Sequence, residues 1–113
     1  FTYTRLLEPT VNNPDRASFC AQVAEDIAGP GSVHRDMKPS MLGEDFGAML
    51  LAKPGCYIWM GQGEADDPES PHNQGLHMTG YDFNDDILPM GAGYWVELVE
   101  KALPYMAQTD KAA

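Results

Sequence analysis

The amino-acid sequence predicts an α/β fold with few strands, about three helices and an incomplete sheet. The apolar run at residues 56–60 lies between Gly55 and Gly61, as is typical of a strand buried on both faces of a sheet. Elsewhere apolar residues recur at helical spacing, which predicts helices that cover such a sheet. These few strands cannot complete a sheet, so further strands or a partner are expected from elsewhere.

The first helix is predicted to begin at Pro14. Asn13 is a suitable N-cap and proline suits the first helical position. Phe19 and Val23 belong to an apolar stripe at helical spacing. The Gly-Pro-Gly sequence at residues 29–31 is expected to end the helix.

The remaining elements follow from alternation, spacing and turn residues. Residues 1–6 alternate like a strand, and the chain begins with phenylalanine, so we expect it to be cut from something longer. Pro104 is expected to end or kink the last helix. The other predicted elements are a short strand at 32–37, a helix at 44–52, a polar surface loop at 62–74, a helix at 89–106 and a frayed tail at 108–113.

Composition excludes several classes of function. The 113 residues have a formal net charge of −10, which disfavours binding to nucleic acid. No apolar run is long enough for a membrane span. We expect a soluble cytoplasmic protein. Cys20 and Cys56 show no metal-binding spacing, so free thiols are expected, with a disulfide left open.

His77 is the strongest candidate functional residue. It follows an acidic loop in the sequence and precedes Asp82 and the other oxygen-bearing side chains of residues 81–86. An imidazole beside carboxylates suits a metal site or a general base, but also a loop histidine bonded to a nearby aspartate. His34 and His72 have no ligand spacing with it, so any metal site would need ligands from outside this stretch.

Two further pairs have both a structural and a functional interpretation. Glu44 and Asp45 start a helix, where they complement its dipole or orient a metal ligand. Gly61 and Gly63 follow the predicted buried strand, where α/β sheets bind ligands, but they also suit a simple turn.

Three segments in order resemble the C-terminal region of hippurate hydrolases, which are N-acyl-amino-acid amidohydrolases of the zinc aminoacylase/carboxypeptidase superfamily. The segments are Gly-Glu-Asp-Phe at 43–46, Pro-Gly-Cys-Tyr-Ile-Trp-Met-Gly at 54–61, and Leu-His-Met-Thr-Gly-Tyr-Asp-Phe-Asn-Asp at 76–85. The last segment is the most specific. The resemblance covers nearly the whole chain and implies part of the catalytic domain of a zinc-peptidase-like fold.

The resemblance implies that His77 is a metal ligand of a site with two divalent ions, zinc, manganese or similar. The family's other ligands and its general base belong to the N-terminal half, so no catalytic residue is expected in this segment, which alone is expected to bind no metal. Glu44, Asp45 and Asp82 would support the site, and the glycines after Met60 would line the substrate cleft. Thr79 replaces a proline common in relatives, which leaves the loop geometry open.

The resemblance also divides the chain. Residues 1–12 would be the last strand of an inserted lid domain and its hinge, residues 13–107 the C-terminal part of the catalytic domain, and residues 108–113 the tail. The expected partners are the N-terminal part of the same domain, a small N-acyl amino acid or peptide, and, as one option, a second copy of the parent bound through the lid domain.

Two hypotheses on function follow. In the first, the parent protein hydrolyses the amide bond of an N-acyl amino acid or small peptide, and this segment alone is inactive. In the second, the segment is a non-catalytic structural or interaction module. Tight zinc binding by the isolated chain would refute the second hypothesis, since one histidine provides one ligand.

Overall fold

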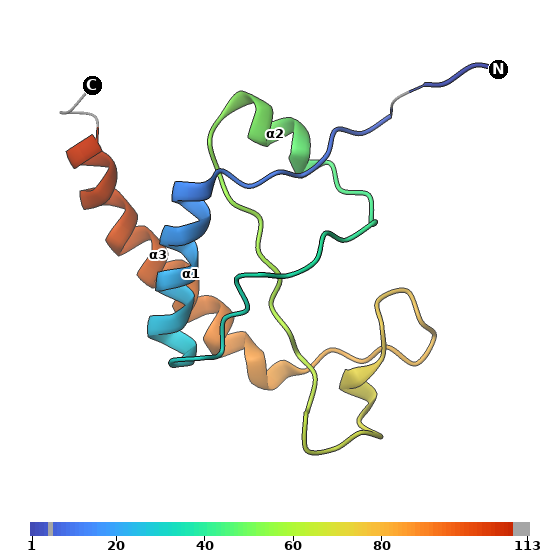
Figure 1. The fold of residues 1–113 in the computed structure, drawn as a ribbon. Coiled ribbons are helices and arrows are strands. Elements are labelled where there is room, and N and C mark those ends of the chain that lie inside the picture. The colour runs from blue at the N-terminus through green and yellow to red at the C-terminus, as the bar shows by residue number, and fades with distance from the viewer. Residues whose placement is uncertain (5, 110–113) are drawn as a thin grey trace. The chain divides into compact units, whose positions relative to one another are not determined.

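The computed structural model describes residues 1–4 and 6–109. They form two compact units, Phe1–Ile58 and Trp59–Ala113, which are described separately. The first unit contains helices α1 (Pro14–Ala28) and α2 (Phe46–Ala52) (Figure 1). The second contains two short 3-10 helices, η1 (Pro71–Asn73) and η2 (Asp85–Ile87), and helix α3 (Leu88–Thr109).

The prediction of an α/β fold is wrong, because the residues that the structure describes form helices and irregular segments without a strand. The segments at 1–6, 32–37 and 56–60, all predicted as strands, have neither a bridge nor a ladder in their described parts. No sheet, complete or incomplete, is present in residues 1–4 and 6–109.

The Asn12 side chain gives the physical reason at residues 56–60. The Tyr57 backbone N–H donates to Asn12 Oδ1 (2.7 Å), and Asn12 Nδ2 donates to the Tyr57 carbonyl oxygen (2.8 Å). One side-chain amide therefore satisfies both backbone groups that a neighbouring strand would otherwise bond. The apolar run is also not a buried one, since Ile58, Trp59 and Met60 are all exposed.

Helix α1 agrees with its prediction at both ends. The Asn13 side chain accepts a hydrogen bond from the Arg16 backbone N–H (3.1 Å), and Pro14 occupies the first turn. At the other end Gly29 has φ +91°, a conformation that favours glycine, and its N–H donates to the Glu25 carbonyl oxygen (2.8 Å). Val23, with 1% of its surface exposed, is the centre of the apolar stripe.

Helix α2 begins at Phe46, later than predicted. Asp45 occupies the capping position but makes no side-chain capping bond. Its buried Gly47 faces the chain near Glu8. A Cβ atom at residue 47 would lie 2.6 Å from the Glu8 carbonyl oxygen and 3.0 Å from that of Pro9. The absence of a side chain therefore lets backbone pack directly against backbone inside the first unit.

The two cysteines meet in this unit. Cys20 and Cys56 form no disulfide, and their side chains are within hydrogen-bonding reach of each other. The hydrogen bond with Cys20, followed by burial, raises the pKa of the Cys56 thiol far above its ordinary value. The Asn13 N–H donates to the Gly55 carbonyl oxygen (3.0 Å), which helps to hold this segment against α1.

Helix α3 is the longest element of the second unit, and Pro104 lies inside it without ending it. Tyr94 is its buried aromatic residue and is in edge-to-face contact with Trp95. A Cβ atom at Gly91 would lie 3.1 Å from Met60 Cε, so this helix packs close to the chain at residue 60. The predicted tail falls partly on residues 110–113, which lie outside the described residues.

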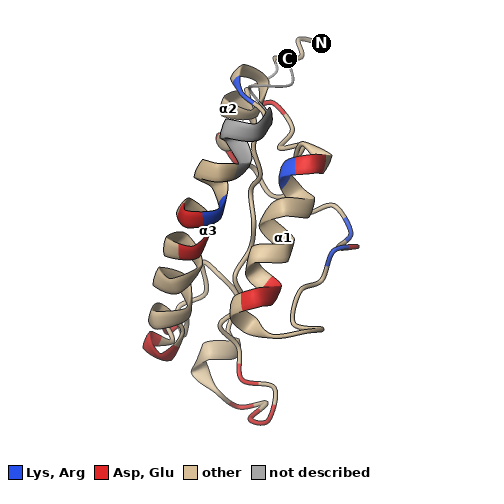
Figure 2. Ribbon diagram, turned by 90° about the vertical axis from the view of Figure 1, so that its left-hand side faces the viewer, with Lys and Arg blue, Asp and Glu red and all other residues tan. Residues whose placement is uncertain are grey.

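Most large apolar side chains of the described residues are exposed. The buried apolar residues are Val23 in the first unit and Tyr94 in the second, while side chains such as Leu51, Trp95 and Leu103 face solvent. Acidic residues are spread over α1, α3 and the loops (Figure 2). Among the described residues no helix combines the length and apolarity that a membrane crossing requires.

Candidate functional site

The segment that carries His77 is a closed loop, residues 62–84, which we call the His77 loop. Gln62 Nε2 donates to the carbonyl oxygens of Asp82 (2.7 Å) and His72 (3.3 Å). In return the Asn84 backbone N–H donates to Gln62 Oε1 (3.3 Å), and Asn84 Nδ2 donates to the Gln62 carbonyl oxygen (3.1 Å). The two amide residues thus join the two ends of the loop reciprocally.

Asn73 ties the first half of the same loop. Its Nδ2 donates to the carbonyl oxygens of Glu64 (2.9 Å) and Asp67 (2.8 Å), and its Oδ1 accepts from the Glu64 N–H (2.8 Å). Ser70 is buried and accepts from the His72 N–H (3.2 Å) at the start of η1. The polar stretch predicted as a surface loop is therefore bonded internally at several points.

Asp82 lies beside His72. The His72 Nδ1 atom is 3.9 Å from Asp82 Oδ2 and 3.3 Å from the Asp82 carbonyl oxygen. The His72 side chain keeps 21% of its exposure, so it is partly enclosed. Sequence proximity links Asp82 to His77, whereas in the structure Asp82 lies against His72.

His77 itself is exposed and lies at a turn with φ +68°. A positive φ is uncommon for any residue other than glycine, and histidine tolerates it better than most. The surrounding turns are closed by hydrogen bonds from Met78 N–H to the Gly75 carbonyl oxygen (3.2 Å) and from Tyr81 N–H to the Met78 carbonyl oxygen (3.1 Å). This conformation leaves the imidazole accessible to a ligand.

Glu44 and Asp45 lie in the other unit, at the start of α2. Glu44 Oε1 accepts from the Phe46 N–H (3.1 Å), and Glu44 Oε2 accepts from the Tyr57 hydroxyl (3.0 Å). A hydrogen bond with the Asp45 side chain, together with those from Phe46 and Tyr57, lowers the pKa of Glu44. The Glu44 carboxylate in turn raises the pKa of the Tyr57 hydroxyl. Glu44 is therefore engaged in local bonds at the helix start.

The two glycines after Met60 differ in what surrounds them. A Cβ atom at Gly63 would lie 2.5 Å from Asn73 Oδ1, so the Asn73 bonds require a small residue there. A Cβ atom at Gly61 would meet nothing within 4 Å. Gly63 thus belongs to the bonding of the His77 loop, whereas Gly61 has no such constraint from the described residues.

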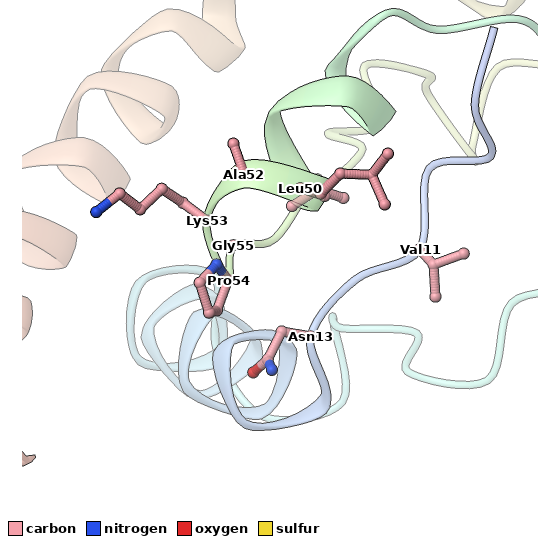
Figure 3. Close-up of a pocket in the computed structure, with 8 residues that line it drawn as sticks. Val11, Asn13, Leu50, Ala52, Lys53, Pro54 and Gly55 are labelled. Atoms are coloured by element: carbon pink, nitrogen blue, oxygen red, sulfur yellow. The ribbon is translucent and has the colours of Figure 1, made fainter. Parts of the chain in front are cut away.

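A shallow hollow of about 280 Å³ lies in the first unit (Figure 3). It is bounded by Val11 and Asn13 on one side and by residues 50–55 on the other. Lys53 is its one ionisable side chain, and Glu44 and Asp45 do not line it. The hollow therefore contains none of the residues that the sequence singled out for chemistry.

The residues that the structure describes contain no cluster of three or more potential metal ligands. His77 thus offers one ligand, and the described part of the chain does not by itself fit a complete metal site. Gln62, Asn73 and Asn84 escaped sequence reasoning because a single amide residue in a loop shows no periodicity; the family motif contains Asn84 but does not reveal its partner.

Comparisons with known proteins place the chain in a family. Residues 1–101 match the model of peptidase family M20/M25/M40. The chain therefore belongs to this family, as the motif at residues 76–85 indicated. No solved structure matches it significantly.

Individual relatives are similar over a small part of their own length. Hippurate hydrolase of Campylobacter jejuni is 30% identical over 83% of this chain and 22% of the relative. N-acetyldiaminopimelate deacetylase of Lacticaseibacillus casei is 33% identical over 81% of this chain and 22% of the relative, and that of Leuconostoc mesenteroides is 39% identical over 62% and 17%. The chain thus spans about a fifth of the length of the curated relatives it matches.

Proposed function

We propose that this chain is the C-terminal part of a metal-dependent hydrolase that cleaves the amide bond of N-acyl amino acids or small peptides. Family membership is the observation that carries the proposal, and the activities by which the relatives are named, hippurate hydrolase and N-acetyldiaminopimelate deacetylase, support the substrate class. In this reaction water adds across the amide bond. The acyl carbon gains the oxygen, the C–N bond breaks, and the nitrogen leaves as an amine.

His77 is the residue of this chain that we propose to hold a metal ion. Its support is the Leu-His motif, the exposed imidazole and the turn conformation at φ +68°. A pair of divalent ions, zinc, manganese or similar, would activate water and polarise the amide carbonyl. The remaining ligands and the general base would come from the N-terminal part of the same catalytic domain.

The exposed apolar surface supports the same partner. On helix α3, Trp95 keeps 63% of its exposure, Val99 54% and Leu103 67%, and their spacing of four residues places them on one face of the helix. Soluble proteins rarely leave large contiguous apolar patches uncovered. The N-terminal part of the catalytic domain would cover such side chains, and Glu44 and Asp45 would lie near the assembled site. We also propose a cytoplasmic location and, for the parent, dimerisation through a lid domain.

The proposal is tested on the whole protein, encoded from its first codon. Purified protein should hydrolyse N-benzoylglycine or an N-acetyl amino acid, and a strong chelator should abolish this activity until a divalent metal is restored. Chelated protein that retains its full activity would contradict the metal requirement. Absence of hydrolysis over a panel of N-acyl amino acids and dipeptides would contradict the substrate class.

The alternative is that the isolated 113-residue chain acts as a non-catalytic structural or interaction module, in which His77 is a single metal ligand. It predicts that calorimetric titration of this chain with zinc shows no stoichiometric tight binding. Binding with a dissociation constant of about 1 nM would contradict it, because tight binding needs three or four protein ligands.

A further inference from the structure

We propose that Gln62 is a positioning residue that holds both ends of the His77 loop and so places the His77 imidazole. This inference rests on the proposed function for its catalytic consequence, but the holding of the loop is a property of this chain. Gln62 is half-buried and takes part in four hydrogen bonds, to His72, Asp82 and Asn84. In the sequence, His77 lies between His72 and Asp82.

Three of the four bonds use the Gln62 side chain, with directions that only a primary amide provides, whereas the fourth uses the Gln62 backbone carbonyl oxygen. The Nε2 group donates to two carbonyl oxygens, and Oε1 accepts from a backbone N–H. A carboxylate of the same shape keeps the acceptor but loses both donors, and it faces the carbonyl oxygens of His72 and Asp82 at short range. Glutamate at residue 62 should therefore open the loop although it fills the same space.

An open loop would allow the imidazole many positions. Fixing a segment of backbone costs conformational entropy, so a loop without its closing bonds samples other conformations. When a ligand or reactive group is displaced by about 1 Å, the rate of a reaction that depends on its position can fall by about 100-fold. Gln62 would act on the reaction in this way without touching metal or substrate.

The first experiment measures amide hydrogen exchange in the whole protein. Gln62→Ala removes the three side-chain bonds and Gln62→Glu removes the two that Nε2 donates, so both variants should increase the exchange rates of residues 72–84 by at least about 10-fold. Gln22→Ala is the matched control, because Gln22 is an exposed glutamine of α1 that bonds Asp26 within the same helix. Unchanged exchange in residues 72–84 of Gln62→Glu would overturn the proposal.

The second experiment separates positioning from general stability. In the whole enzyme, Gln62→Glu should lower kcat by about 10–100-fold with KM within about threefold of the wild type, as for residues that orient a metal ligand. A general loss of folded protein would lower the melting temperature and the active fraction, so kcat is calculated per folded, active enzyme. Unchanged kcat together with faster loop exchange would overturn the positioning role.

The two proposals fail in different ways. If the wild-type protein hydrolyses no N-acyl amino acid, the proposed function fails, and the exchange experiment still decides whether Gln62 holds the loop. If the wild type is active and the loop of Gln62→Glu remains protected, the proposed function stands and the inference on Gln62 fails.

Discussion

The two units of the molecule both use side-chain amides to hold irregular backbone, but at different ranges. In the first unit Asn12 joins its own segment to Tyr57, 45 positions away, and so fastens the chain beside α1. In the second unit Gln62 joins residues 10 to 22 positions away and closes one loop around an exposed histidine. We expect the two long-range bonds of Asn12 to contribute to the stability of the first unit, and the shorter-range bonds of Gln62 to determine the position of His77.

The largest effect is expected from Gly47→Ala in the first unit. The new Cβ atom would lie 2.6 Å from the Glu8 carbonyl oxygen, and backbone yields less easily than a side chain. We expect a loss of about 1–3 kcal/mol in the free energy of unfolding, measured by urea denaturation. Gly43→Ala is the control, because its Cβ atom meets the flexible end of Leu7 at 3.2 Å. Equal stability of the two variants would contradict the packing of α2 against residues 8 and 9.

Removal of the Asn12 amide should have the next largest effect. Asn12→Ala leaves the Tyr57 N–H and carbonyl oxygen without their partner, which costs about 1–3 kcal/mol when such groups are shielded from water. The measurement is again urea denaturation, with Gln22→Ala as the control that removes an exposed amide. A loss no larger than that of the control would show that Asn12 does not fasten this segment.

The two glycines after Met60 give a matched pair in the second unit. Gly63→Ala would displace Asn73 Oδ1, 2.5 Å from the new Cβ atom, and should cost the loop about 1 kcal/mol of local stability. Gly61→Ala meets nothing within 4 Å and should change little. Amide exchange at Glu64, which donates to Asn73, reports the difference. Equal exchange in the two variants would contradict the account of Asn73.

The smallest effect concerns pH in the first unit. The pKa of Glu44 is lowered, so its bond to Tyr57 contributes stability above the ordinary glutamate range and loses it as pH falls through the folded pKa. The pKa of Tyr57 is raised, so the contribution is also lost as pH rises through the folded pKa of Tyr57. Urea denaturation of wild type and Glu44→Gln across this range should show a difference only near neutral pH. A difference that persists in strong acid would contradict the assignment.

The sequence predicted the features whose causes are local. Asn13, Pro14 and Gly29 define the ends of α1 because capping depends on residues a few positions apart. The family followed from the ordered motif at residues 76–85. The prediction of a sheet was wrong because an apolar run indicates only a tendency for burial. A strand also needs hydrogen bonds to a neighbouring backbone, and at Tyr57 the Asn12 side chain makes these bonds.

The candidate site could be predicted only as a motif. His77 was found from its neighbours in sequence, but Asp82 lies against His72, a contact that depends on how the loop folds back. Gln62 and Asn73 stabilise the loop through hydrogen bonds to backbone atoms, and no sequence pattern specifies these partners. The metal role of His77 remains a proposal.

The most direct test of that role compares His77→Ala with His34→Ala in the whole protein. His34 is also exposed but lies in the first unit and outside the family motif, so its loss controls for removal of an imidazole. We expect His77→Ala to lose most of its bound metal, measured by elemental analysis, and to lose activity by about 100-fold or more, while His34→Ala keeps both. Full metal content and full activity in His77→Ala would contradict the account.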